Sequence, residues 1–253
     1  TPDSTGLNFY LPQGEFDRLK VSGAGSGLQK MQIILLRMLE EQGMADPIAN
    51  GFHVPSETVV RLDEEQASVL QLPPPFPGSF DTHISGRTGN SSFRVNLSAA
   101  FPEGAAPFDR GGPLLRFGSS ESYRLNPGEL LGLQAWEIHR DLAPVQRGEA
   151  ANLQLMAQLQ VAQRSGMNVD LSHFDKIDVV VPEHIGVVAT QHSDGSVSLS
   201  PSWGDGSTPE ELDRRWGQLD MDAEGGVVRV GSRVVLLEPE KMAGVKEVLG
   251  SRH

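Results

Sequence analysis

The chain has 253 residues, which allows one large domain or two modest ones. Its 38% hydrophobic and 21% charged residues are the balance of a soluble globular protein, and 28 glycines with 17 prolines indicate many turns and short elements. The absence of cysteine excludes disulfides, thiol nucleophiles and cysteine-ligated metals, and the formal net charge of −12 argues against binding nucleic acid through a uniformly basic face. We expect a soluble, cytoplasmic protein, because the chain has neither the apolar run of a membrane span nor a signal-peptide pattern at its N-terminus.

The first part of the chain is predicted to be mostly helical. Residues 1–26 are rich in turn formers and close in the run Ser22–Gly27, which is typical of a flexible linker. From Leu28 to Gly43, apolar residues recur at helical spacing and are numerous enough to predict a helix buried on most of its circumference. The elements expected next are a loop over 45–55, a strand over 57–62, a short helix near 64–71 and a proline-rich boundary over 73–78.

The middle of the chain predicts an antiparallel sheet followed by two helices. Strands over 80–85 and 92–100 flank a turn at Gly86–Gly89, and the second strand alternates well. Its apolar face is Phe93, Val95, Leu97 and Ala99, and its polar face is Arg94, Asn96 and Ser98. The remaining expected elements are a loop over 102–113, strands over 114–117 and 122–125, and helices over 127–142 and 148–165.

The last third predicts two hairpins alternating with two helices. Asp194-Gly195 separates two alternating runs in the manner of a hairpin turn. The expected strands are 179–181, 184–191, 197–200, 227–230 and 233–237, and the expected helices are 209–219 and 239–249. We therefore predict an α+β fold of small, mostly antiparallel sheets with helices packed on one face, in two subdomains. The predicted division is a helical N-terminal part with a short strand (1–75), a sheet with two helices (76–166) and a hairpin–helix–hairpin–helix part (167–253).

Three junctions run from a β-rich stretch into a helix-start signal, at Leu62, Leu125 and Leu237. Asp63 with Gln66, and Asn126 with Glu129, have the spacing of a capping box, in which each side chain accepts the other residue's backbone N–H. Further start signals are Pro127 and Pro239 at the first helical position and the run Thr208-Pro209-Glu210-Glu211. The junctions are unequally spaced, so they indicate ordinary helix starts rather than a solenoid repeat.

One glycine-rich segment invites a nucleotide-binding interpretation. Gly23, Gly25 and Gly27 precede the first helix and Lys30 lies in its first turn, as in loops that bind phosphate through backbone N–H groups. A complete phosphate loop needs lysine directly after the last glycine and then serine or threonine, whereas Leu28 and Gln29 stand there. A flexible connection into the helix is therefore the favoured interpretation, and a nucleotide-binding enzyme using Gly23–Gly27 is the alternative.

Catalytic and metal-binding patterns are otherwise missing from the sequence. Three histidines lie two residues from an aspartate, but none forms an HxH or HExxH pattern, and the serine-containing turns lack the GxSxG elbow. We predict no metal, no catalytic residue and no cofactor in this chain, and lean toward a protein that is not an enzyme on its own.

The predicted central sheet carries arginine rather than lysine: Arg87, Arg94, Arg116 and Arg124. A row of solvent-facing arginines can contact phosphates, so these four are the candidate nucleic-acid-binding residues. Nearby Glu103, Asp109 and Glu121 nearly cancel their charge, which equally fits an ordinary polar sheet face.

Three stretches resemble the N-terminal accessory region of large bacterial Swi/Snf-type helicase-like proteins. They are Leu62–Pro73, Pro75–Phe80 with the following hairpin, and Val180–Val187 with Asp194–Pro201. The resemblance implies a part that docks partners or guides DNA in bacterial defence, with ATP-dependent motor motifs beyond His253. The chain starts at Thr1 without methionine and stops directly after an expected helix, so we expect a fragment of something longer.

The leading hypothesis is thus a non-catalytic accessory module of a bacterial DNA-processing ATPase, which binds a protein partner or the rest of a longer polypeptide and contacts DNA. A purely structural protein-interaction module is the remaining alternative. No membrane partner is expected.

Overall fold

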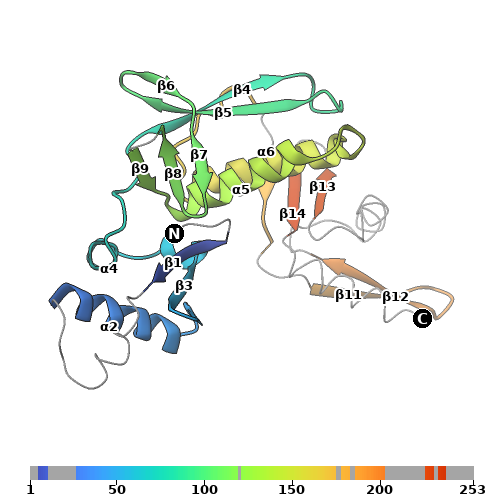
Figure 1. The fold of residues 1–253 in the computed structure, drawn as a ribbon. Helices are drawn as coiled ribbons and strands as arrows, with labels where there is room; N and C mark the ends of the chain where they lie inside the picture. The colour runs from blue at the N-terminus through green and yellow to red at the C-terminus, as the bar shows by residue number, and fades with distance from the viewer. Residues whose placement is uncertain are drawn as a thin grey trace. The chain divides into compact units, whose positions relative to one another are not determined.

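The computed structural model describes residues 5–10, 27–118, 121–174, 178–182, 186–202, 226–230 and 233–237 (Figure 1). Helices and small, mostly antiparallel sheets make up an α+β fold, as the sequence predicts. The chain divides into two compact units: unit 1 is Thr1–His83, Asn96–Gln134 and Ala162–Asp170, and unit 2 is Ile84–Val95, Ala135–Val161 and Leu171–His253. The contiguous division at residues 75 and 166 stays a prediction.

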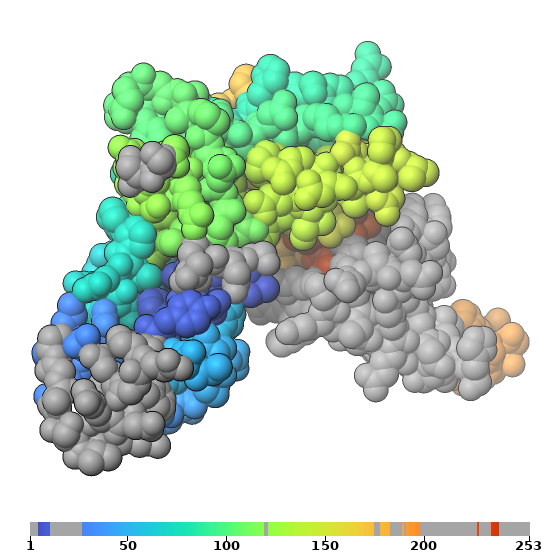
Figure 2. Space-filling model, in the orientation of Figure 1, coloured from blue at the N-terminus to red at the C-terminus, as the bar shows by residue number. Residues whose placement is uncertain are grey.

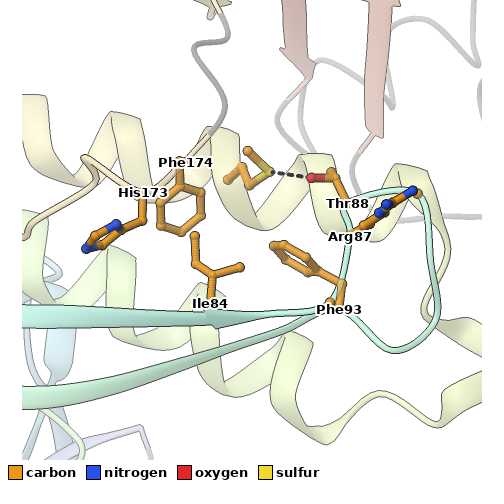
Figure 3. A pocket seen from close by; sticks show the side chains of 9 residues that line it. Ile84, Arg87, Thr88, Phe93, His173 and Phe174 are labelled. Atoms are coloured by element: carbon orange, nitrogen blue, oxygen red, sulfur yellow. Dashed lines mark hydrogen bonds between the residues drawn. The ribbon is translucent and has the colours of Figure 1, made fainter.

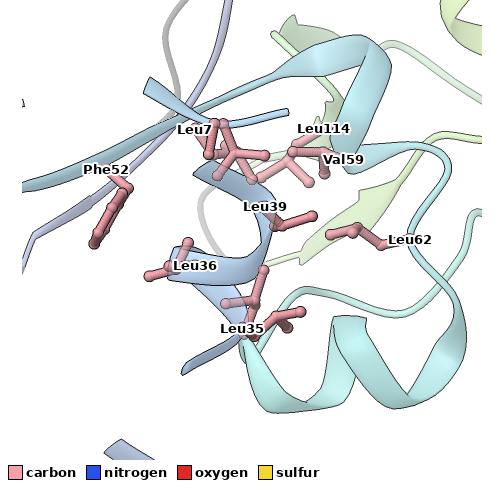
Figure 4. Close-up of a cluster of buried hydrophobic side chains, with 11 residues drawn as sticks. Leu7, Leu35, Leu36, Leu39, Phe52, Val59, Leu62 and Leu114 are labelled. Atoms are coloured by element: carbon pink, nitrogen blue, oxygen red, sulfur yellow. The ribbon is translucent and has the colours of Figure 1, made fainter. Parts of the chain in front are cut away.

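The first core of unit 1 forms where a helix packs on a small sheet. The sheet has the order β1-β3-β2 and is antiparallel throughout, with β1 at Gly6–Tyr10, β2 at Asp46–Ile48 and β3 at Gly51–Pro55. Helix α2 (Gly27–Glu41) lays Leu35, Leu36 and Leu39 into a cluster with Phe52 and Leu7 (Figure 4). Burying this apolar surface is the main force that holds these short elements together.

The expected strand over 57–62 and the expected loop over 45–55 are both wrong. Ser56–Val59 forms the short helix α3, and β2 and β3 lie within the expected loop. The β-branched pair Val59-Val60 suggests a strand by propensity, yet both side chains are buried in a helical turn and the following turn. Tertiary packing has overridden a weak local preference here. The next element, α4 (Glu64–Val69), matches its prediction.

Aromatic side chains form a second core in unit 1. The Phe76 ring lies 5.1 Å from Phe80, 5.6 Å from Phe101 and 6.0 Å from Tyr123, measured between ring centroids. These rings come from sheets of order β4-β5-β6 and β7-β8-β9 and from the segment before them. The strands are β4 (Ser79–Ser85), β5 (Arg94–Phe101), β6 (Gly104–Ala106), β7 (Asp109–Gly111), β8 (Leu114–Phe117) and β9 (Glu121–Arg124).

The structure confirms the predicted alternation of β5 and corrects the loop that follows it. Val95 and Ala99 are buried while Asn96 is exposed. Residues 102–113 do not form one loop, because β6 and β7 lie within them and pair with β5 and β8. Strand β6 lies at the surface with Gly104 and Ala105 exposed (Figure 2).

Both predicted capping boxes are present. Asp63 Oδ1 accepts the Gln66 N–H at 2.7 Å, and Gln66 Oε1 accepts the Asp63 N–H at 3.2 Å. At the start of α5 (Pro127–Asp141), Asn126 Oδ1 accepts the Glu129 N–H at 2.9 Å and Glu129 Oε2 accepts the Asn126 N–H at 2.8 Å. Each box satisfies two backbone N–H groups that a helix start otherwise leaves without partners.

The start of α5 packs closely against the end of α6 (Glu149–Arg164). A Cβ atom on Gly128 would lie 2.5 Å from the Ala162 carbonyl oxygen and 2.7 Å from the Met167 nitrogen, so only glycine fits this approach. The Asn126 side-chain amide also donates to the Gly166 carbonyl at 3.1 Å. The capping asparagine therefore fixes both the start of one helix and the turn after another.

Unit 2 buries one face of α6 against a three-stranded sheet. Leu153 and Ala157 of α6 cluster with Val179, Val234 and Leu236. The sheet has the order β10-β14-β13, in which β10 and β14 are parallel and β13 and β14 antiparallel. Its strands are β10 (Asp178–Val180), β13 (Gly226–Val230) and β14 (Arg233–Leu237).

The predicted Asp-Gly hairpin is confirmed. Strands β11 (Gly186–Gln191) and β12 (Val197–Ser202) pair antiparallel about a turn in which Gly195 has φ +83°. Asp194 Oδ1 accepts the Ser196 N–H at 2.9 Å, which holds the turn. The expected helices over 209–219 and 239–249, with the start signals at Thr208–Glu211 and Pro239, lie outside the described residues.

Burial has an electrostatic cost at the second capping box. Glu129 is only 3% exposed, and burial raises the pKa of its carboxyl from 4.5 to about 7, although the Asn126 N–H acts in the opposite direction. The folded protein therefore keeps a proton that the unfolded chain releases between these two pH values. Stability contributed through this group is highest below pH 4.5 and is lost as the pH rises to about 7.

We predict that Glu129→Gln makes the free energy of unfolding less dependent on pH, because the amide oxygen still caps the helix but does not ionise. Between pH 5 and pH 8 the free energy of unfolding of the wild type should fall by up to about 3 kcal/mol relative to that of the variant. Urea unfolding of both proteins at the two pH values measures this difference. An equal effect of the substitution at both pH values would contradict the assignment.

Candidate functional site

Arg124, one of the four predicted nucleic-acid-binding residues, is a buried structural residue. It is 5% exposed, and its guanidinium donates to the Leu62 carbonyl at 2.7 Å and to Glu64 Oε1 at 3.2 Å. Its backbone N–H donates to the Pro74 carbonyl, and its backbone carbonyl accepts the Phe76 N–H. The expectation that Arg124 faces solvent is wrong, because its strand ends inside unit 1 rather than on an open sheet face.

The other three predicted arginines divide between the two units. Arg87 is exposed in the turn between β4 and β5, and Arg116 is exposed on β8. Arg94 is half-buried and donates to the Ser91 and Phe93 carbonyls, each at 2.7 Å. Arg87 and Arg94 belong to unit 2, whereas Arg116 and Arg124 belong to unit 1. Contact between these arginines and DNA stays a prediction.

The predicted nucleotide loop is described only at its end. Gly23 and Gly25 lie outside the described residues, and Gly27 is the first residue of α2. Lys30 is half-buried in the first turn of this helix. Nucleotide binding at this segment stays a prediction.

Helix α2 differs most from its sequence-based interpretation. The helix was expected to be buried on most sides, yet only Leu35, Leu36 and Leu39 are buried. Four large apolar side chains are at least two-fifths exposed: Leu28 at 41%, Met31 at 50%, Ile34 at 59% and Met38 at 49%. We call these four residues the α2 face. Single exposed hydrophobic residues are normal on a protein surface, whereas four at helical spacing on one helix make the α2 face a candidate interaction site.

The charges beside the α2 face are arranged against the helix dipole. The first turn holds no acidic residue and the last turn no basic one, while Lys30 lies near the positive N-terminal end and Glu40 and Glu41 lie at the negative end. Glu40 is paired with Arg37 at 2.8 Å. This arrangement is unfavourable for an isolated helix and favourable for an antiparallel helix pair, in which each end lies beside the opposite charge of its partner.

Three other buried polar side chains, those of Asn152, His139 and Thr82, serve the fold. Asn152, fully buried on α6, donates through its amide to the Thr88 and Asn90 carbonyls at 2.6 and 3.0 Å. Its oxygen therefore accepts from His139 Nε2 at 2.8 Å, which fixes the tautomer of that imidazole. Thr82 likewise donates to the Asp170 carbonyl.

His139 does not have the features of an acid–base catalyst. Burial lowers its pKa below the ordinary value of 6.5, opposed by the hydrogen bond to Asn152 and assisted by the charges of Arg147 and Arg94. A neutral imidazole 4% exposed and held by Asn152 is a structural donor at neutral pH. Within the described ranges, no group of three or more metal-ligating side chains comes together, and no helix is long and apolar enough to cross a membrane.

Comparison with known proteins gives no identification: no protein-family model matches the chain, and no curated protein matches its sequence significantly. The geometry of the described residues is therefore the basis for a functional conclusion. It leaves the α2 face as the candidate functional site. Periodicity alone detects such a stripe but does not tell a buried face from an exposed one.

We predict that Arg124→Met lowers the free energy of unfolding by about 1–3 kcal/mol, because the Leu62 carbonyl loses its buried donor. Most of this loss should come from that carbonyl, since the Glu64 side chain is 80% exposed and its ion pair is screened by water. Arg116→Met is the matched control, and should change stability by less than about 0.5 kcal/mol. Urea unfolding compares the variants, and equal effects at the two positions would contradict a structural role for Arg124.

Proposed function

We propose that the chain is a non-catalytic protein-interaction module and that its α2 face binds the α2 face of a second copy in antiparallel orientation. The observation that carries this proposal is the exposure of Leu28, Met31, Ile34 and Met38 on one helix. Covering these side chains removes apolar surface from water, which is the main driving force of protein association.

Charge complementarity supports a second copy as the occupant. In an antiparallel pair centred on Ile34, Lys30 of each helix lies opposite Met38 of the other, and Glu41 lies about 4.5 Å further along the axis, within reach of the long lysine side chain. The two helix dipoles also oppose each other, so charges that are unfavourable in one helix become favourable in the pair. The same chain thus supplies both the apolar face and the complementary charges.

The pairing should be weak. A helix of 15 residues is about 22 Å long, so one face of it covers far less than the roughly 800 Å² per partner of a standard interface. We expect dissociation constants on the order of tens to hundreds of micromolar. Such an affinity fits a module whose copies are brought together by other contacts.

The proposal extends to the larger protein of which this module would be part. The sequence resemblance suggests an accessory part of a bacterial DNA-processing ATPase, and a weakly self-associating module fits such an assembly. DNA contact is a separate expectation, and its test is now limited to Arg87, Arg94 and Arg116 because Arg124 is buried.

We predict that the wild type shows a rising weight-average mass between about 5 and about 300 µM in sedimentation velocity, starting from the 27.3 kDa monomer. Ile34→Lys should keep the chain monomeric, because it places two like charges at the centre of the pair. Ile138→Lys is the matched control: Ile138 is 67% exposed on α5, so the same substitution there should leave association unchanged.

A charge exchange tests the antiparallel orientation. Lys30→Glu alone should weaken association, and adding Glu41→Lys should restore it. A monomeric wild type across the whole range would overturn self-association. Insensitivity to Ile34→Lys, or failure of the second charge change to restore pairing, would place the contact elsewhere.

A further inference from the structure

Unit 2 contains a cavity that the proposed interaction does not use. Its volume is about 400 Å³, within the range of small-molecule sites. The cavity lies between the turn that joins β4 to β5, helix α6 and the segment before β10 (Figure 3). Its apolar wall is formed by Ile84, Phe93, Met156 and Phe174.

The wall of this cavity is held by buried hydrogen bonds. Asn152 fixes the turn through the Thr88 and Asn90 carbonyls, and His139 fixes Asn152 in turn. The Phe93 ring meets the His139 ring edge-on, with 6.0 Å between centroids. The cavity is therefore shaped before a ligand arrives, and a preformed site spends little binding energy on ordering its own loop.

The turn itself requires glycine. Gly86 has φ +81°, and a Cβ atom there would lie 2.7 Å from the Ser92 carbonyl oxygen. The sharp bend brings Arg87 to one end of the cavity, while His173 lies at the other with Ile84, Phe93 and Phe174 between them (Figure 3). The apolar surface is thus bounded at both ends by a nitrogen-bearing side chain.

Arg87 is chemically available. Its side chain is exposed and makes no hydrogen bond or ion pair with the residues that the structure describes. A planar guanidinium binds the two oxygens of a carboxylate with two parallel hydrogen bonds. A single guanidinium suits a carboxylate better than a phosphate, since phosphate sites gather several charged or backbone donors.

We propose that this cavity binds a small aromatic carboxylate, with the ring between Ile84, Phe93 and Phe174 and the carboxylate on Arg87. The aromatic walls favour a flat apolar body through offset or edge-on ring contacts. Arg87 then gives charge selectivity, because an uncharged analogue leaves the guanidinium without its charged partner. The site gives Arg87 a role other than the phosphate contact expected from the sequence.

Isothermal titration of the full chain with 1-naphthoate tests the proposal, with the uncharged 1-naphthamide as the matched ligand. We expect a sub-millimolar dissociation constant for 1-naphthoate, and binding of the amide weaker by about tenfold or more. Arg87→Gln should weaken 1-naphthoate binding by a similar factor. Arg61→Gln, which changes an exposed arginine of unit 1, should leave it unchanged.

A second variant tests the contribution of the apolar cavity to binding separately from that of the Arg87 charge. Ile84→Trp fills the space between the walls and should abolish binding of both ligands while the thermal midpoint stays near that of the wild type. No binding of 1-naphthoate to the wild type, equal binding of acid and amide, or binding unaffected by Arg87→Gln and Ile84→Trp would each overturn the proposal. Because the α2 face lies in unit 1, these outcomes are independent of the sedimentation results.

Discussion

Unit 1 depends on one buried cation. The Arg124 guanidinium joins the end of β9 to the Leu62 carbonyl at the start of α4, and its backbone joins the same strand to the proline-rich segment at Pro74 and Phe76. The next residue adds a third connection, because the Leu125 N–H donates to the Pro113 carbonyl. A charge held in this way is expensive to leave without its partners, so segments far apart in sequence are held in a single arrangement.

The same logic separates structural from functional residues in this chain. Glu129, His139 and Asn152 carry chemistry that is often catalytic, but each is buried and bonded to a helix start, a neighbouring side chain or a loop carbonyl. The two proposals use exposed groups instead: the apolar α2 face in unit 1 and Arg87 beside the cavity of unit 2. Neither proposal, association through the α2 face or recognition through the cavity, requires a reactive group.

Local features of this fold were predictable from the sequence and long-range ones were not. The capping pairs Asp63–Gln66 and Asn126–Glu129 and the Asp194-Gly195 turn depend on residues two or three positions apart, so their spacing alone reveals them. The burial of Arg124 depends on a carbonyl 62 residues away, and the cavity needs Phe93, Met156 and Phe174 from three separate segments. Strands β6 and β7 have three residues each, which is too few for an alternating pattern. The apolar stripe of α2 did not indicate which of its side chains would be buried in the core and which would stay exposed.

The central claim is that Arg124 holds separate segments of unit 1 together through hydrogen bonds and does not serve as a contact for nucleic acid. Amide hydrogen exchange of the wild type and Arg124→Met under native conditions measures this directly, because it reports the opening of individual segments. The account predicts faster exchange in the variant for the amides of α4 and of Phe76, with unchanged exchange in the β11–β12 hairpin of unit 2. Unchanged protection in α4 and at Phe76 would contradict it.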